Sequence, residues 1–290
     1  HIQRMYNETK ENGRMQRGSK QNGKALSNTF VRRVHAVLQA ALKQAVKERL
    51  IPYNPCENCR IPPKDKKEMT ILPPEKIGRY LQEAEKYGVL PMFYLELSSG
   101  LRRGELLALQ WEDLNVKERI LTVNKQVTRM EGELDVTEPK TKNSVRKVAL
   151  SQQAVDLLVQ EHEQHPDNPI LFPSPRTGGY WSPDAVSRIN RKLLKSAGIE
   201  EHVRFHDLRH TFATMAISSG VDVKTLSSML GHFSAGFTLD TYTHITNDMQ
   251  RGAAEKIGGF MESVTAANTP EPPDPPEESR CKVIPFEKVG

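Results

Sequence analysis

The 290-residue sequence is poor in cysteine: it contains three, at Cys56, Cys59 and Cys281. A small odd number of cysteines argues against a disulfide framework and favours a reducing compartment. Cys56 and Cys59 have the spacing of metal ligands, but no second cysteine or histidine pair follows nearby in the sequence. Because a structural zinc ion needs about four ligands, we interpret the pair as part of a loop and predict no metal site.

Long apolar runs are also missing. No stretch approaches the ~18 apolar residues of a membrane-spanning helix, and no signal peptide opens the sequence. The composition, 37% hydrophobic and 27% charged, is typical of a soluble and largely helical protein. Because the chain begins with His1 rather than methionine, we expect the natural protein to extend further upstream.

Acidic residues are scarce in the first part of the chain. Residues 1–67 hold 15 Lys/Arg against 5 Asp/Glu, a net charge of +10. Residues 68–262 hold 23 against 26, a net charge of −3, and residues 263–290 hold 3 against 5, a net charge of −2. A basic segment joined to a near-neutral body is typical of a nucleic-acid clamp attached to another domain. A solvated basic helix face would explain the charge equally well.

Apolar residues recur at helical spacing between residues 28 and 51, which predicts an amphipathic helix with Asn28 or Ser27 as its N-cap. Residues 1–27 show no periodicity. The proline- and lysine-rich stretch at 51–69 predicts an interdomain linker.

Helical patterns dominate the rest of the chain. We expect helices at 73–87, 91–100, 101–114, 152–163, 183–197, 206–219, 222–231 and 248–263. The segments ILTVNKQVT, ELDVTEP and SVRKVALS alternate and are rich in β-branched residues, which predicts a small antiparallel sheet. The sequence therefore predicts a mainly α fold with a small antiparallel β-sheet (α+β), followed by a proline- and acid-rich tail at 265–290.

Several short motifs could bind an anion. In RFHDLRHTFAT, His206 and Arg209 lie three residues apart and share one face of the expected helix. GLRRGELL places Arg102 and Arg103 at a junction between helical segments, and guanidinium groups suit phosphate oxygens. Glu105 could equally be a simple ion-pair partner in a surface charge cluster.

Other motifs are common by chance when taken singly. PKTKNSVRK places lysines and arginines between two strand-like segments, at Lys140, Lys142, Arg146 and Lys147. LGH at 230–232 ends a helix, where a histidine often serves as a dipole partner. Tyr242, the tyrosine of LDTYTH, could be a core aromatic residue.

The order of these motifs is more specific than any one of them. Gly-Leu-Arg with a glutamate three residues after the arginine, a lysine hairpin, His-x-x-Arg, Leu-Gly-His and a tyrosine ten residues later form one set. This set resembles the tyrosine recombinases, the family of phage and transposon integrases. The resemblance runs from about residue 70 to 262, and more loosely through 28–51. GFTLDTYTHI and PKTKNSVRKVAL are similar to integrases of Gram-positive conjugative transposons and phages.

The resemblance assigns a catalytic set: Arg102, Glu105, Lys140, His206, Arg209, His232 and Tyr242. It implies that Tyr242 attacks a DNA phosphodiester and forms a 3′-phosphotyrosyl link, which another strand's 5′-hydroxyl then displaces by way of a Holliday junction. The arginines would hold the phosphate oxygens, His206 would be the base, and Lys140 would protonate the leaving 5′-oxygen, with Lys142 as the second choice. No metal or cofactor is expected.

The resemblance also implies an organisation. Residues 1–66 would form part of a core-binding domain that clamps DNA, and residues 67–264 the catalytic domain. The expected DNA contacts are Arg32, Arg33, Lys43, Lys47 and Lys142. The expected partner is double-stranded DNA at the ends of a mobile element and at target sites, in the cytoplasm of a prokaryote, with an accessory excision factor as a further candidate.

Family members act as tetramers on DNA and exchange a C-terminal segment. The expected helix at 248–263 carries an apolar set suited to such docking, Met249, Ile257, Phe260 and Met261, although packing within the same chain is an alternative. Two other functions stay open at this point. A type I topoisomerase shares the tyrosine, arginines and lysine, and a catalytically silent DNA-binding protein could use the same scaffold.

Overall fold

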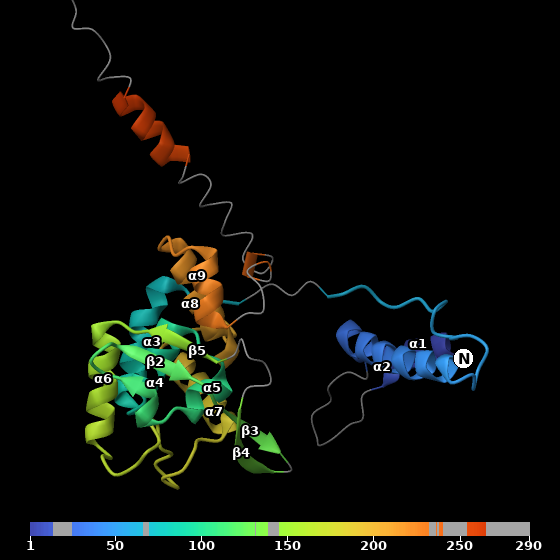
Figure 1. Cartoon of the computed structure of the whole chain (residues 1–290), viewed down its shortest axis with the longest axis horizontal. Helices are drawn as coiled ribbons and strands as arrows, with labels where there is room; N and C mark the ends of the chain where they lie inside the picture. The colour runs from blue at the N-terminus through green and yellow to red at the C-terminus, as the bar shows by residue number, and fades with distance from the viewer. Residues whose placement is uncertain are drawn as a thin grey trace, which may run out of the picture. The chain divides into compact units, whose positions relative to one another are not determined.

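The computed structural model describes residues 1–13, 25–65, 70–130, 132–138, 145–231, 236, 238–239 and 254–264. The chain divides into two compact units, His1–Met69 and Thr70–Gly290 (Figure 1). Each unit has its own packing and is described by itself. Within the described ranges, no helix combines the length and the apolar character needed to cross a membrane.

The N-terminal unit contains two helices, α1 (Ile2–Asn12) and α2 (Asn28–Lys47). Tyr6 of α1 is buried and its hydroxyl lies 3.0 Å from Nδ1 of His35 in α2. Helix α1 lies within residues 1–27, where the sequence shows no periodicity and where we had placed no element. Ser27 is the N-cap of α2, since its hydroxyl accepts a hydrogen bond from the Phe30 backbone N–H.

Helix α2 ends four residues before the predicted end at residue 51. Arg49 has a positive φ of 60°, which a continuing right-handed helix does not allow. Pro52 follows closely and cannot donate a helical hydrogen bond. Cys56 is buried beneath the helices and lies 3.6 Å from the Tyr6 hydroxyl, and Cys59 is partly exposed.

The second unit is mostly helical. Its helices are α3 (Pro74–Lys86), α4 (Leu90–Ser99), α5 (Arg103–Ala108), the short 3-10 helix η1 (Trp111–Asp113), α6 (Gln152–Glu163), α7 (Pro183–Ser196), α8 (Phe205–Ser218) and α9 (Val223–Leu230). Residues 254–264 are also helical. In Figure 1, α8 and α9 lie at one end of this unit.

The single helix expected at 101–114 is wrong, because the chain leaves the helix after Ala108. The Trp111 backbone N–H donates to the Pro169 carbonyl at 2.8 Å, and the Leu171 N–H donates to the Leu109 carbonyl at 2.9 Å. This pairing with a distant segment draws residues 109–110 into an extended conformation, after which η1 begins at Trp111. Tertiary hydrogen bonds here override the local helical pattern.

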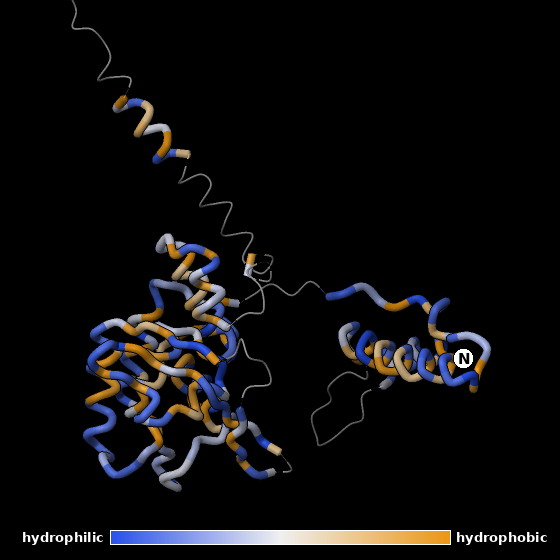
Figure 2. Tube along the Cα trace, in the orientation of Figure 1, coloured by the Kyte–Doolittle hydropathy of each residue, from blue (hydrophilic) through white to orange (hydrophobic). Residues whose placement is uncertain are grey.

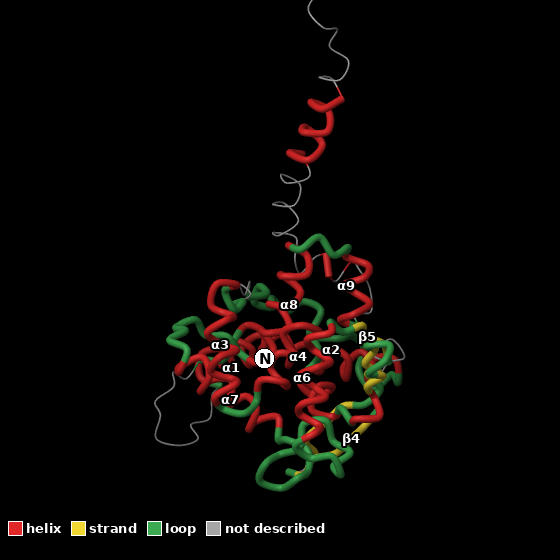
Figure 3. Tube along the Cα trace, turned by 90° about the vertical axis from the view of Figure 1, so that its left-hand side faces the viewer, coloured by secondary structure: helices red, strands yellow, loops and turns green. Residues whose placement is uncertain are grey.

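The described strands form a three-stranded antiparallel sheet and a separate hairpin. The sheet has the order β1 (Leu114–Asn115), β2 (Ile120–Val123), β5 (Arg146–Ala149), and the hairpin pairs β3 (Gln126–Met130) with β4 (Glu133–Thr137). Figure 3 shows the strands gathered along one side of this unit. ILTVNKQVT is therefore two strands in two sheets, while the predicted mainly α fold with small antiparallel sheets is confirmed.

The core of the second unit packs helices against the inner face of the three-stranded sheet. Phe93 of α4 makes edge contacts with Tyr80 and Phe205, at ring-centroid distances of 5.8 and 5.7 Å. Hydrophilic and hydrophobic residues alternate along the helices and strands of the unit (Figure 2). Strand β5 alternates, so that Arg146 and Val148 both point inward. One inward position of the sheet is thus an arginine.

Candidate active site

Glu105 is the centre of a buried charge cluster at the start of α5. Its carboxylate accepts a hydrogen bond from the Arg102 backbone N–H at 2.9 Å and one from Arg102 Nη1 at 2.7 Å. Only 2% of the Glu105 side chain is exposed, against 38% for Arg102. The same carboxylate therefore caps the helix and fixes the position of the Arg102 side chain.

Arg146 approaches the same carboxylate from β5. Its Nη1 lies 3.1 Å from Glu105 Oε1 and its Nη2 lies 2.8 Å from Oε2, a two-point contact between buried groups. Burial alone would raise the pKa of Glu105, but the hydrogen bonds and charges of Arg146 and Arg102 outweigh it and lower that pKa. Glu105 is therefore ionised at neutral pH.

The C-terminal end of α9 faces this cluster. The last carbonyls of a helix lack intrahelical partners and carry its negative dipole end. Three consecutive carbonyls here each accept from a different arginine: Met229 from Arg146 Nε at 2.6 Å, Leu230 from Arg209 Nη2 at 2.6 Å, and Gly231 from Arg102 Nη2 at 3.0 Å. The three guanidinium groups thus converge on one helix end.

Gly231 closes α9 in the left-handed conformation, with φ of 63°. A Cβ at this position would also lie 3.1 Å from Cδ and Nη1 of Arg146. The Leu-Gly-His motif therefore needs glycine both for the turn and for the close approach of Arg146. The residue that follows directly in the chain is His232.

Arg209 extends from α8 and is almost wholly buried, with 3% exposure. Besides Leu230, it donates from Nη1 to the Gly100 carbonyl at 2.6 Å. Gly100 is the C-cap of α4 with φ of 60°. Desolvation, with the charge of Arg102, lowers the Arg209 pKa to about 10, so the side chain is still cationic at neutral pH.

His206 lies in the first turn of the same helix, with its side chain exposed. Partial desolvation by the surrounding groups and the positive charge of Arg209 nevertheless lower its pKa. The ring makes an edge contact with His210 at 5.1 Å, and desolvation, with His206, lowers the His210 pKa to about 4. His206 is consequently neutral at pH 7 and able to accept a proton.

Glu96 of α4 is a second acid near the arginines. The side chain is fully buried, and neither carboxyl oxygen has a hydrogen-bond partner among the residues that the structure describes. Burial raises its pKa well above the ordinary value, although the charges of Arg209 and Arg146 oppose this effect. The raised pKa favours the neutral form of Glu96, whereas the lowered pKa of Glu105 favours its carboxylate.

The structure brings together four of the predicted catalytic residues, Arg102, Glu105, His206 and Arg209. The others, and the predicted DNA contact Lys142, lie outside the described residues: Lys140, Lys142, His232 and Tyr242. Arg103, the neighbour of Arg102, turns away and donates to the Pro183 carbonyl and the Ser187 hydroxyl.

The predicted catalytic set omitted Arg146. In SVRKVAL the alternation that places Val148 and Leu150 in the core also places residue 146 on the inner face. An arginine at a core-facing strand position needs a buried anionic partner. The alternation of inward and outward positions along this strand was therefore the sequence signal that could have identified Arg146.

The basic residues predicted to contact DNA lie on α2 of the N-terminal unit. Arg33, Lys43 and Lys47 are exposed, whereas Arg32 is partly buried and donates to the Pro62 carbonyl at 2.9 Å. Among the residues that the structure describes, no group of three or more His, Cys, Asp or Glu side chains is arranged to hold a metal ion.

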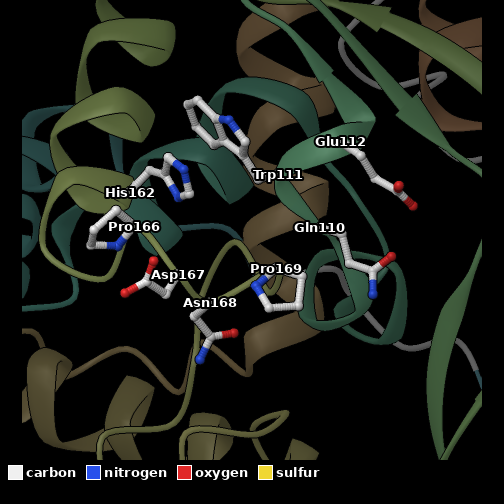
Figure 4. Close-up of a pocket in the computed structure, with 8 residues that line it drawn as sticks. All are labelled: Gln110, Trp111, Glu112, His162, Pro166, Asp167, Asn168 and Pro169. Atoms are coloured by element: carbon white, nitrogen blue, oxygen red, sulfur yellow. The ribbon is translucent and has the colours of Figure 1, made fainter.

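A separate cleft in the second unit lies between η1 and the chain after α6 (Figure 4). Trp111 stacks on His162 there, with ring centroids 4.0 Å apart and planes inclined by 11°. The lining residues include none of the predicted site residues: Gln110, Trp111, Glu112, His162, Pro166, Asp167, Asn168 and Pro169. The cleft is therefore distinct from the arginine cluster, which consists of Arg102, Arg146 and Arg209.

Comparison with known proteins identifies the family. A model of the phage integrase family matches residues 71–249. The ICEBs1 integrase of Bacillus subtilis (strain 168) is 31% identical over 249 residues, which cover 81% of this chain and 67% of that protein. A protein called tyrosine recombinase XerC-like, from Caldanaerobacter subterraneus subsp. tengcongensis, is 29% identical over 288 residues, covering 90% and 70%.

The fold has a counterpart among solved structures. The Tn1549 transposon integrase, in complex with a circular intermediate DNA, matches with a TM-score of 0.74 at 22% identity, over 88% of this chain and 84% of that one. The chain belongs to the phage integrase family. It is a site-specific DNA recombinase of the tyrosine type, as the order of its motifs predicted.

Proposed function

We propose that this recombinase integrates or excises a mobile DNA element, with Tyr242 as nucleophile and the arginine cluster as the phosphate site. One observation carries the proposal: Arg102 and Arg209 donate to the adjacent carbonyls of Gly231 and Leu230. Their guanidinium groups therefore lie side by side, next to neutral His206. Two forked cationic donors are suited to the non-bridging oxygens of one phosphodiester.

The chemistry follows from these charges. Attack by the Tyr242 hydroxyl forms an O–P bond, breaks the bond from phosphorus to the 5′-oxygen, and adds negative charge in the transition state. Arg102 and Arg209 offset that charge in a partly desolvated site. A phenol with an ordinary pKa near ~10 needs a base, and His206 takes its proton. Lys140, or Lys142 in its place, gives a proton to the leaving 5′-oxygen.

The phosphotyrosyl link preserves the energy of the broken bond, so that a second strand can be joined without ATP. The 5′-hydroxyl of a partner duplex attacks the link, Tyr242 leaves with a proton, and a Holliday junction results. The names of the ICEBs1 and Tn1549 integrases support a conjugative element as the cargo. The cognate sites are then the ends of that element and its target.

The N-terminal unit would clamp the duplex through the basic residues of α2, Arg33, Lys43 and Lys47 among them. The protein would assemble as a homotetramer on DNA, in a prokaryotic cytoplasm, with an accessory excision factor for the reverse reaction. The helix at 254–264 supports exchange between protomers, because Ile257 and Phe260 are 64% and 66% exposed. Apolar side chains of this size are normally covered by a partner surface.

The test is strand exchange on a plasmid that carries two copies of the element's joined ends. The expected products are two circles of defined lengths. Relaxed plasmid of unchanged sequence would favour a topoisomerase, and binding without any change in the DNA would favour a silent DNA-binding protein. Arg209→Lys on the same plasmid, with DNA binding retained, is the matched inactive control.

A further inference from the structure

Arg146 lies in the arginine cluster but has no step in the chemistry proposed above. Its side chain is 6% exposed, and two of its contacts are to both oxygens of Glu105. A third contact runs from Nε to the Met229 carbonyl at 2.6 Å. These contacts reach α5 and α9 from a strand, so that one side chain links three elements.

The charge balance depends on this residue. Glu105 Oε1 accepts from Arg102 Nη1 at 2.7 Å and from Arg146 Nη1 at 3.1 Å, so the two arginines share one carboxylate. The guanidinium groups of Arg102 and Arg146 both donate to the single Glu105 carboxylate, and Arg209 lies beside them at the end of α9. Without Arg146, the Glu105 carboxylate would pair with Arg102 alone and would neutralise most of its positive charge. Arg102 would then attract an incoming phosphate less strongly.

The position of the site depends on it as well. Arg146 packs against Gly231, the residue before His232, and holds the carbonyl two residues earlier. It also begins β5, four residues after Lys142. Arg146 therefore contacts the end of α9 that precedes His232 in the sequence, and it begins the strand that follows Lys142.

We propose that Arg146 is a positioning residue of this recombinase: it neutralises Glu105 so that Arg102 stays available to the phosphate, and it holds the end of α9 that leads into His232. This inference rests on the proposed function. Both terminal nitrogens of Arg146 donate to Glu105, and we assign Arg146 no contact with the DNA phosphate.

The experiment uses the full chain and a nicked suicide substrate that carries one end of the element. Arg146→Gln, Arg146→Lys, Glu105→Gln and the double variant Arg146→Gln/Glu105→Gln are compared with the parent. The rate of covalent complex formation at saturating DNA, the Kd for the DNA and the Tm are measured separately. Arg103→Gln is the matched control. This substitution also removes a positive charge, together with the two hydrogen bonds of Arg103 to Pro183 and Ser187, but Arg103 does not contact Glu105.

We expect Arg146→Gln to slow cleavage about 100-fold, the scale of a catalytic group displaced by about 1 Å, with an unchanged Kd. Arg146→Lys should fall between this variant and the parent, and Arg103→Gln should cleave at the parent's rate. The double variant should cleave faster than Arg146→Gln, because no carboxylate then neutralises Arg102. A residue that only stabilises the fold would give a double variant as slow as Arg146→Gln, or slower.

The outcomes separate the two proposals. A parent that forms no covalent complex overturns the proposed function and this inference with it. A parent that forms the complex, with Arg146→Gln equally fast, overturns the role of Arg146 alone. A double variant no faster than Arg146→Gln overturns the charge argument. If Arg146→Gln unfolds at the assay temperature, Arg146→Lys with and without Glu105→Gln decides the same question.

Discussion

Arg146 and Glu105 form a two-point ion pair in which both side chains are nearly inaccessible to water, 6% and 2% exposed. Buried pairs of this kind contribute little net stability, because desolvation offsets much of the attraction. Removal of one partner is costly, since it leaves an uncompensated charge. The pair therefore constrains the geometry of the site more than it stabilises the fold.

Arg209→Lys tests the forked contact at the end of α9. Lysine keeps the charge but cannot donate in one plane to both the Gly100 and the Leu230 carbonyls. We expect covalent complex formation to fall by about 100- to 1,000-fold, the range for losing one oriented donor to a developing oxyanion, while DNA binding measured by gel shift persists. A variant that cleaves at the parent's rate would show that the fork is dispensable.

The pH profile of cleavage tests His206 as the base. Its pKa is lowered by desolvation and by Arg209, and a base acts only when deprotonated. Activity should therefore be full at neutral pH and fall on the acid side with a midpoint below the ordinary histidine value of about 6.5. His206→Gln should remove this acid limb along with most of the rate. An acid limb centred above that value in the parent would contradict the assignment.

Glu96→Gln tests the neutral buried acid. The native protein keeps a proton that the unfolded chain releases above a pH of about 4.3, so this group makes the free energy of unfolding fall as pH rises. The variant has no such proton to lose. The difference in Tm between the variant and the parent should therefore shift in favour of the variant between pH 4 and pH 8. Glu118→Gln, a substitution of an exposed glutamate, should show no such shift. A pH-independent difference would mean that Glu96 is ionised in the native state.

The salt dependence of DNA binding tests the basic face of α2. Each phosphate contact contributes about 0.9 to the slope of log Kobs against log salt. Lys43→Gln and Lys47→Gln should each reduce that slope by about 1 and leave the cleavage rate at saturating DNA unchanged. Lys117→Gln, an exposed lysine of the second unit outside the proposed contacts, is the control. Unchanged slopes for both α2 variants would place the contacts elsewhere.

Sequence reasoning was most successful where local chemistry determines structure. Helices with clear periodicity and caps, such as α6 with Ser151 as its N-cap, were predicted to within a residue or two. The order of the Arg102, His206–Arg209 and Leu-Gly-His motifs correctly indicated the family.

The remaining features depend on contacts between residues distant in sequence. Residues 109–111 leave the helix because of partners at 169–171. Arg146 likewise has its place because of Glu105, which lies 41 residues earlier in the chain. Strand parity could have placed Arg146 in the interior, but it could not have named Glu105 as its partner.

The central claim is that Tyr242 is the nucleophile of a site built on Arg102 and Arg209. The measurement that tests it most directly is covalent complex formation on the nicked suicide substrate by the parent, Tyr242→Phe and the control Tyr94→Phe, whose hydroxyl bonds Gln153 on the surface. The account predicts a denaturant-resistant protein–DNA complex for the parent and the control, with the DNA attached to the peptide that contains residue 242, and none for Tyr242→Phe. A complex that persists in Tyr242→Phe would contradict it.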